Sequence, residues 1–178
     1  MLLTRLLAVA FLLGLVPPAA AQQPSLEYDV KAAFILNFAR YVEWPPPERQ
    51  PPLRICVLER NPFGDRLTAV VAGERWEGGA IEVRVVPDVR RASECHLLYV
   101  PAAAMPRFTA GASLVTSRPV LTVGEHERFL DQGGIMRLFL EDNRVRFSVN
   151  QTSAERAGLQ ISSRLLRLAR AVIGAGRL

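Results

Sequence analysis

The sequence predicts a single α/β domain in which helices flank both faces of a twisted, mixed β-sheet. Two observations lead to this prediction. Short apolar runs typical of buried strands alternate with stretches of helical periodicity, which is the pattern of parallel strands joined by helices. Two later runs separated by a turn over residues 141–143 have the pattern of an antiparallel hairpin, so both strand directions are expected. The 178 residues, 49% of them hydrophobic and 22% charged, suffice for one domain with a substantial core.

The first 21 residues have the pattern of a secretory signal peptide. Arg5 precedes the apolar run of residues 6–16, and the small residues Ala19 and Ala21 form a cleavage site. The run is too short for a bilayer, which takes about 20 apolar residues. We expect cleavage after Ala21 and an exported domain of residues 22–178, with an uncleaved membrane anchor as the alternative.

The exported domain is expected to begin with a helix over residues 27–42. Apolar side chains recur there at three- to four-residue spacings, and Glu27 and Lys31 form a favourable i,i+4 pair. Prolines concentrated in residues 45–52 end the helix and form a stiff connector. The apolar residues 53–58 that follow predict a buried strand.

Strands and helices then alternate. A turn at residues 61–64 leads into a short helix over 65–72. Residues 80–86 alternate apolar and charged side chains, which indicates a strand near a sheet edge. Residues 95–100 form an almost continuous apolar run, as expected of a central parallel strand. An irregular helix is expected over residues 102–109.

The C-terminal part begins with another short buried strand at residues 119–123, followed by a short helix over 125–131. The hairpin is expected to pair residues 135–140 with residues 145–149.

Two helices are expected to end the chain. Thr152 and Glu155 form a capping box for a helix that ends near Gly158. The last helix begins near Ser162. Its expected buried residues are Leu165, Leu166, Leu168, Ala169, Val172 and Ile173. Three arginines, Arg164, Arg167 and Arg170, would form a ridge on its outer side.

The charge pattern argues against a nucleic-acid partner. The formal net charge of +5 is spread over arginines, and Lys31 is the only lysine. No run of basic residues exceeds Arg90-Arg91, and aromatic residues are not interleaved with them as a stacking platform requires.

No catalytic, metal or cofactor motif can be assembled. The chain has neither a G-x-S-x-G nucleophile elbow nor a phosphate-binding glycine loop. His96 and His126 lack metal-ligand spacings to carboxylates, and Glu125-His126-Glu127 is better explained as a solvated segment than as a metal site. Cys95 and His96 are strand neighbours that point to opposite faces, so the histidine cannot easily activate the thiol. A binding or regulatory module without cofactors is favoured over an enzyme.

The two cysteines, Cys56 and Cys95, are expected to form a disulfide between the first and third strands, because disulfides persist in exported proteins. The alternative is two buried free thiols.

Several blocks in this chain together resemble the YfiR/HmsC-like family of periplasmic proteins. In chain order, the blocks are VKAAFILNF (30–38), YVEWP (41–45), ICVL (55–58), NPFG (61–64), CHLLYV (95–100), GGIM (133–136), VRFSVN (145–150), AGL (157–159) and SSRLL (162–166).

The resemblance implies a periplasmic regulator that binds the sensor region of an inner-membrane diguanylate cyclase and represses it, which limits cyclic-di-GMP and biofilm formation. It also implies release by an outer-membrane lipoprotein or by redox damage, and a tendency to form a homodimer. Cys56 and Cys95 match a cysteine pair that is bridged in relatives. A second pair, which flanks the glycine-rich segment in some relatives, is missing from this sequence, so gating through that pair is not implied here.

Two sets of side chains are candidates for partner contact. The first is Asn37, Tyr41 and Trp44, which combine polar and aromatic character at one helix end. Their alternative roles are a buried amide for Asn37 and core packing for the two aromatic residues. The second set is the expected ridge of Arg164, Arg167 and Arg170, which suits an acidic partner but also complements the helix dipole.

A different class of function also fits the sequence, namely a periplasmic small-molecule-binding module that feeds a membrane sensor kinase.

Overall fold

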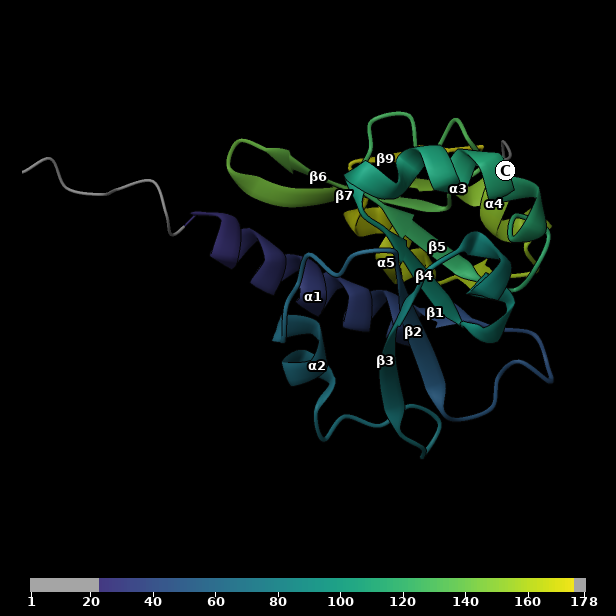
Figure 1. The fold of residues 1–178 in the computed structure, drawn as a ribbon. Coiled ribbons are helices and arrows are strands. Elements are labelled where there is room, and N and C mark those ends of the chain that lie inside the picture. The colour runs from purple at the N-terminus through teal and green to yellow at the C-terminus, as the bar shows by residue number, and fades with distance from the viewer. Residues whose placement is uncertain (1–22, 175–178) are drawn as a thin grey trace, which may run out of the picture.

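The computed structural model describes residues 23–174, with side chains from residue 26 onward. These residues fold around a mixed β-sheet (Figure 1). In spatial order its seven strands are β3 (Ile81–Val86), β2 (Leu53–Leu58), β4 (Leu97–Val100), β5 (Leu121–Gly124), β6 (Met136–Glu141), β7 (Arg144–Asn150) and β9 (Ala171–Ile173). The strands from β3 to β6 run parallel, β7 is antiparallel to β6, and β9 is parallel to β7. The expected mixed sheet is confirmed, whereas the expected signal peptide lies outside the described residues.

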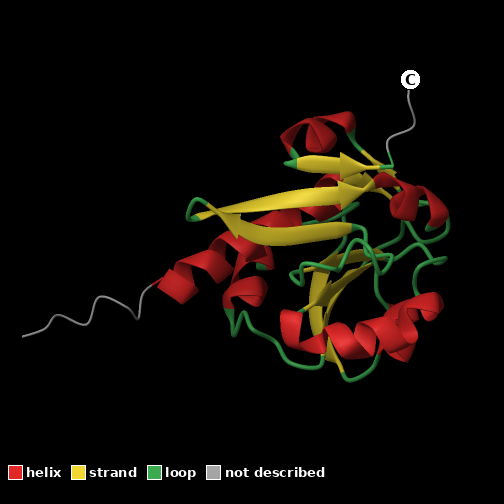
Figure 2. Ribbon diagram, turned by 90° about the horizontal axis from the view of Figure 1, so that it is seen from above, coloured by secondary structure: helices red, strands yellow, loops and turns green. Residues whose placement is uncertain are grey.

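Helices cover both faces of the sheet, as predicted (Figure 2). One face packs against α1 (Gln23–Tyr41), α2 (Arg66–Val71) and α5 (Ser163–Leu168). The other face packs against α3 (Met105–Gly111) and the short 3-10 helices η1 (Val89–Glu94), η2 (Ala102–Ala104) and η3 (Ala112–Leu114). The remaining helix is α4 (Gln151–Arg156), and a small antiparallel pair joins β1 (Val42–Glu43) to β8 (Gln160–Ile161).

The central strands are apolar on both sides because each side faces a different core. In β2, Ile55 and Val57 belong to the core beneath α1, whereas Cys56 and Leu58 belong to the core beneath α3. The predicted edge position of β3 is also confirmed, since β3 ends the sheet and its Val85 is 51% exposed.

The hairpin of β6 and β7 turns at the predicted place. Asp142 and Asn143 both have positive φ angles, 49° and 57°, a conformation that these two residue types tolerate better than most. The next helix, α4, differs from the prediction at its start. The side chain of Asn150 accepts a hydrogen bond from the N–H of Ser153 and caps the helix, so Thr152 is not the capping residue.

Two predicted helices are wrong in whole or in part. Residues 125–131 form a series of turns instead of a helix. The last helix begins where expected but ends at Leu168, because the chain becomes extended at Ala169 and residues 171–173 pair with β7. Consequently Leu168 is 74% exposed instead of buried, and Ile173 is exposed as well.

Candidate partner-binding surface

The C-terminal end of α1 lies beside the start of α5. The N–H of Ser162 donates a hydrogen bond of 2.9 Å to the carbonyl oxygen of Tyr41, and β1 pairs with β8 next to it. Asn37 and Tyr41 lie one turn apart on α1, and both side chains are exposed. Asn37 is therefore not the buried amide that its apolar neighbours suggested.

Trp44 lies in the core and not on this surface. It is 3% exposed and packs edge-on against Trp76, with ring centroids 5.8 Å apart. Of the helix-end trio, only Asn37 and Tyr41 are placed to meet a partner.

The three C-terminal arginines do not form one ridge. Arg164 and Arg167 are exposed on α5. Arg170 follows the end of the helix, and its Nε lies 2.9 Å from a carboxylate oxygen of Glu141 in β6. The prediction failed because it continued the helix past Leu168.

These observations define the α1–α5 surface, which consists of Asn37, Tyr41, Arg164, Arg167 and Leu168. An exposed leucine on the same short helix as two exposed arginines gives this surface apolar area beside positive charge, a combination common in protein interfaces. Leu168 was missed as a surface residue because its helical spacing fits burial equally well.

A buried ionic cluster lies at the carboxyl ends of β4 and β5. Lys31 of α1 is 4% exposed, and its Nζ lies 2.6 Å from a carboxylate oxygen of Glu125 and also contacts the carboxylate of Glu27. The hydroxyl of Tyr99 donates to Glu125, and the Lys31 ammonium lies 4.7 Å from the ring centroid of Tyr28. The sequence pattern indicates only the local pair of Glu27 and Lys31, because Glu125 is 94 residues away from Lys31.

The cluster shifts the pKa values of three groups, and burial together with the charge of Glu125 raises the pKa of Tyr28. Burial raises the pKa of Tyr99 strongly, and the negative charge of Glu125 adds to the effect. Burial alone would lower the pKa of Lys31, but hydrogen bonds and charge attraction from Glu125 and Glu27 outweigh it and raise the value. Lys31 is thus held as a cation, which fastens α1 to this edge of the sheet.

The opposite edge holds the disulfide. Cys56 of β2 is bonded to Cys95, which precedes β4, and their Cα atoms are 5.9 Å apart. Both residues are buried beneath α3 and η1, which fits the expected pairing. Across residues 23–174, no group of three or more His, Cys, Asp or Glu side chains is arranged to hold a metal ion.

A family model described as YfiR/HmsC-like matches residues 28–170. The chain belongs to the YfiR/HmsC-like family. This family comprises periplasmic, non-catalytic regulators of diguanylate cyclases. Within the described part of this YfiR/HmsC-like protein, no helix is long and apolar enough to cross a membrane.

Two solved structures share the fold. A conserved domain protein from Vibrio cholerae O1 biovar El Tor str. N16961 aligns with a TM-score of 0.54 at 13% identity over 82% of the chain. An ABC domain in complex with L-Trp from Streptococcus pneumonia aligns with a TM-score of 0.51 at 12% identity over 83% of the chain. The YfiR/HmsC-like chain spans 60% of the length of each. No curated protein gives a significant match.

Proposed function

We propose that this protein binds the periplasmic sensor region of an inner-membrane diguanylate cyclase and holds that enzyme inactive, which limits cyclic-di-GMP signalling and biofilm formation. The observation that carries the proposal is the family match over residues 28–170. Export by cleavage after Ala21 is part of the proposal, and the N-terminal sequence of the protein from the periplasm tests it. Release by an outer-membrane lipoprotein and assembly as a homodimer belong to the same proposal.

The α1–α5 surface is the proposed contact with the cyclase. Tyr41 and Leu168 supply apolar area, and the side chains of Arg164 and Arg167 suit an acidic partner. An aromatic anchor beside arginines is the composition that interface hot spots favour. Trp44 and Arg170 are left out because Trp44 is buried and Arg170 is paired with Glu141.

A filled crevice supports binding over catalysis. Ligands of open α/β sheets usually lie at the carboxyl ends of the strands where the strand order reverses, which here is the position between β2 and β4. In this protein Phe63, Tyr28 and Tyr99 pack edge to face there, with ring centroids 5.4 Å and 4.7 Å apart in the two pairs, and Lys31 lies beside them. The crevice is occupied by the protein's own side chains.

Deletion and complementation test the proposal. Deletion is expected to raise cellular cyclic-di-GMP, and a tagged copy is expected to co-purify with a membrane cyclase. The wild-type protein and an Arg90→Glu/Arg91→Glu control are expected to restore low levels, whereas Arg164→Glu/Arg167→Glu is expected to fail. Both variants reverse two exposed arginines, but the control pair lies on η1, against the opposite face of the sheet. Unchanged cyclic-di-GMP after deletion contradicts the proposed function. Equal complementation by both variants contradicts only the proposal that the α1–α5 surface contacts the cyclase.

A second candidate is a small-molecule-binding module that feeds a membrane sensor kinase. A cavity of about 580 Å³ lies between α3 and the turns after β5, lined by Met105, Thr109, His126, Arg128 and others. It is near the carboxyl ends of β4 and β5, where α/β proteins bind ligands, and the similar Streptococcus pneumonia structure holds L-Trp. Strong ligand-dependent stabilisation in a thermal-shift screen favours this candidate, and a flat response across metabolites counts against it.

A further inference from the structure

The outer side of β3 is a regular strand edge without a partner. β3 pairs with β2 over all six of its residues and ends the sheet, and no other strand of residues 23–174 lies against its outer side (Figure 1). The strand contains neither a proline nor a bulge, two devices by which natural edge strands avoid pairing. A further strand can therefore be added beside β3.

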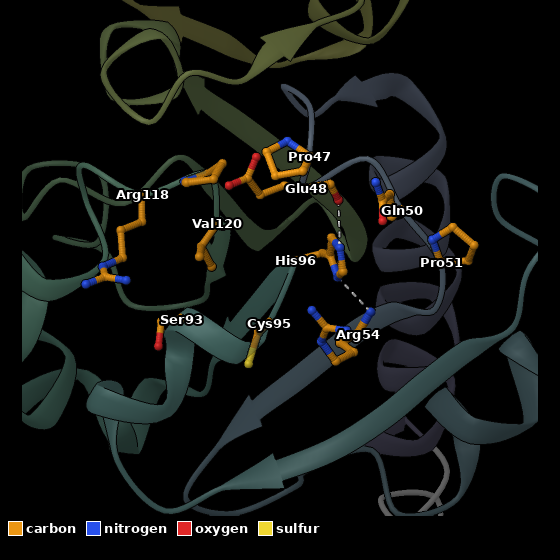
Figure 3. A pocket seen from close by; sticks show the side chains of 11 residues that line it. Pro47, Glu48, Gln50, Pro51, Arg54, Ser93, Cys95, His96, Arg118 and Val120 are labelled. Atoms are coloured by element: carbon orange, nitrogen blue, oxygen red, sulfur yellow. Dashed lines mark hydrogen bonds between the residues drawn. The ribbon is translucent and has the colours of Figure 1, made fainter.

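The neighbouring strand β2 is already bonded on the side away from β3. The N–H of Arg54 donates a hydrogen bond of 3.0 Å to Nδ1 of His96, and the carbonyl oxygen of Arg54 accepts one of 2.9 Å from the N–H of His96 (Figure 3). The Nε2 of His96 lies 2.8 Å from the carbonyl oxygen of Glu48 in the connector. Because an N–H can only donate and a carbonyl can only accept, the imidazole is neutral, with its proton on Nε2. Both backbone groups of Arg54 thus point toward β4.

The bonds on the other side of β2 show which backbone groups of β3 are free. The N–H of Leu53 donates to the carbonyl oxygen of Ala80, and the carbonyl oxygen of Val86 accepts from the residue that follows β2. Because the backbone groups of successive strand residues point to opposite sides, the even-numbered residues of β3 face β2. The N–H and carbonyl groups of Ile81, Val83 and Val85 therefore face outward, as a row that another strand can bond.

The two charged residues of β3 make this row self-complementary. Glu82 and Arg84 pair with each other on one face, and their side chains are 37% and 51% exposed. When two copies of β3 lie antiparallel with Val83 opposite Val83, the Glu82 of each copy lies opposite the Arg84 of the other. Opposite charges across two strands stabilise their pairing, whereas like charges destabilise it. A second copy of this chain is therefore the partner that suits the strand.

Neighbouring registers lose this match. The register that places Val83 opposite Ile81 brings two Glu82 side chains together, and the register that places Val83 opposite Val85 brings two Arg84 side chains together. A shift by one residue places outward groups of one copy opposite residues whose groups face β2. The register with Val83 opposite Val83 also covers Val85, which is 51% exposed, with Ile81 of the second copy. Charge, backbone and apolar contacts all favour this one register.

We propose that this protein forms a two-fold homodimer in which the β3 strands of two copies pair antiparallel, with Val83 opposite Val83. The same strand serves both copies, so the interface closes at two chains and joins the two sheets into one. The inference deepens the proposed function by naming the interface of its homodimer, and it rests on no other part of that function. Because the pairing is a property of the purified protein alone, its failure and a failure to bind the cyclase are separate results.

Sedimentation equilibrium over a range of protein concentrations tests the dimer. The mass of the wild-type protein is expected to approach that of two chains as the concentration rises. Glu82→Arg and Arg84→Glu are each expected to weaken dimerisation at least about tenfold, because each turns both cross-strand pairs into like charges. The double variant Glu82→Arg/Arg84→Glu exchanges the charges and is expected to dimerise like the wild-type protein. Arg146→Glu, which reverses an exposed arginine on the interior strand β7, is the matched control and is expected to dimerise unchanged.

A mixture of the two single variants tests the register. Glu82→Arg and Arg84→Glu repel their own copies, but across the proposed register every charge of one variant lies opposite an opposite charge of the other. The mixture is therefore expected to form a mixed dimer, which native mass spectrometry identifies by its mass. Neither neighbouring register predicts this recovery, because each places residue 82 or residue 84 opposite its own copy.

Hydrogen exchange of the backbone amides tests the strand itself. The amides of Ile81, Val83 and Val85 are expected to exchange rapidly in dilute protein and to become protected as the concentration rises. The amides of Glu82 and Arg84 face β2 and are expected to be protected at every concentration.

Any of four results overturns the proposal. The first is a wild-type mass of one chain at every concentration. The second is a dimer that neither single variant weakens, and the third is a mixture of the two single variants without a mixed dimer. The fourth is a dimer in which the amides of Ile81, Val83 and Val85 stay unprotected. If a single variant does not fold, the mass and the amide exchange of the wild-type protein still decide the question.

Discussion

The two ends of the parallel strands attach α1 and the connector that follows it to the sheet by different chemistry. At the carboxyl edge, the cation Lys31 is buried between Glu125 and Glu27, beneath the hydroxyl of Tyr99. At the amino edge, a neutral imidazole holds the connector that follows α1, next to a disulfide. The contacts at the carboxyl edge require a charged lysine, whereas the contact with the N–H of Arg54 at the amino edge requires a neutral imidazole.

One domain can therefore be sensitive to base at its carboxyl edge and to mild acid at its amino edge. The Lys31 ammonium loses its charge only at high pH, whereas a neutral imidazole gains a proton under mild acid. The two edges can therefore be disturbed separately.

The largest expected effect is loss of the disulfide at the amino edge. Because the bridge closes a sequence separation of 39 residues, the Cys56→Ala/Cys95→Ala variant is expected to lose about 4 kcal/mol of unfolding free energy in the chain-entropy model. Denaturant unfolding of the variant and of the oxidised wild-type protein measures the difference. Free-thiol counting under denaturing conditions gives the matching control: two reactive thiols in the untreated protein would contradict the bridge.

Removal of the cation at the carboxyl edge is expected to cost slightly less. Lys31→Met removes the buried cation and leaves the partly buried carboxylates of Glu125 and Glu27 without a positive partner, a loss that costs up to about 3 kcal/mol. The double variant Lys31→Met/Glu125→Gln is expected to recover part of that loss, because it also removes a partly buried negative charge. A double variant no more stable than Lys31→Met would show that the buried charge is not the cause.

The free energy of unfolding is expected to decrease at both low and high pH, for different reasons. Below 6.5 the unfolded chain takes up a proton at His96 more readily than the folded chain, because the pKa in the folded state is lowered, so stability decreases as the pH falls through that region. Above about pH 10 the unfolded chain loses protons from Tyr99 and Lys31 first, because both pKa values are raised in the folded state, so stability decreases again.

Single variants assign the two limbs. His96→Gln is expected to flatten only the acidic limb, and Tyr99→Phe to reduce only the alkaline limb, to which Lys31 still contributes, in unfolding curves recorded across the pH range. An acidic limb that survives in His96→Gln would locate acid sensitivity elsewhere.

The smallest expected effect belongs to an exposed ion pair away from both edges. Arg170→Ala removes the contact with Glu141, and both side chains are at least one-third exposed, so the change in unfolding free energy is expected to stay below about 1 kcal/mol. A larger loss would mean that the pairing of β9 with β7 depends on this contact.

The sequence alone was sufficient to predict the strands and turns that depend on a local pattern of residues. Residues 53–58 and 97–100 form central strands, as their mainly apolar runs indicate, and Asp142-Asn143 turns the hairpin. The last helix was predicted too long because the apolar run Ala171–Ile173 suits a helix or a strand, and only its pairing with β7 decides between them.

The candidate site was predictable only in part. Asn37 and Tyr41 were predicted for partner contact because they combine polar and aromatic character at one helix end. The exposure of Leu168 could not be predicted in this way, because it depends on where α5 ends. The contacts of both edges join residues far apart in sequence, with 94 residues between Lys31 and Glu125 and 48 between Glu48 and His96. No local sequence pattern predicts such contacts.

Repression by direct contact through the α1–α5 surface is tested most directly by measuring the affinity of the purified protein for the purified periplasmic region of its cyclase. We predict saturable binding by the wild-type protein and by the Arg90→Glu/Arg91→Glu control, and a loss of at least about tenfold in affinity for Arg164→Glu/Arg167→Glu, equivalent to about 1.4 kcal/mol. Absence of binding by the wild-type protein, or equal affinity of all three proteins, would contradict this account.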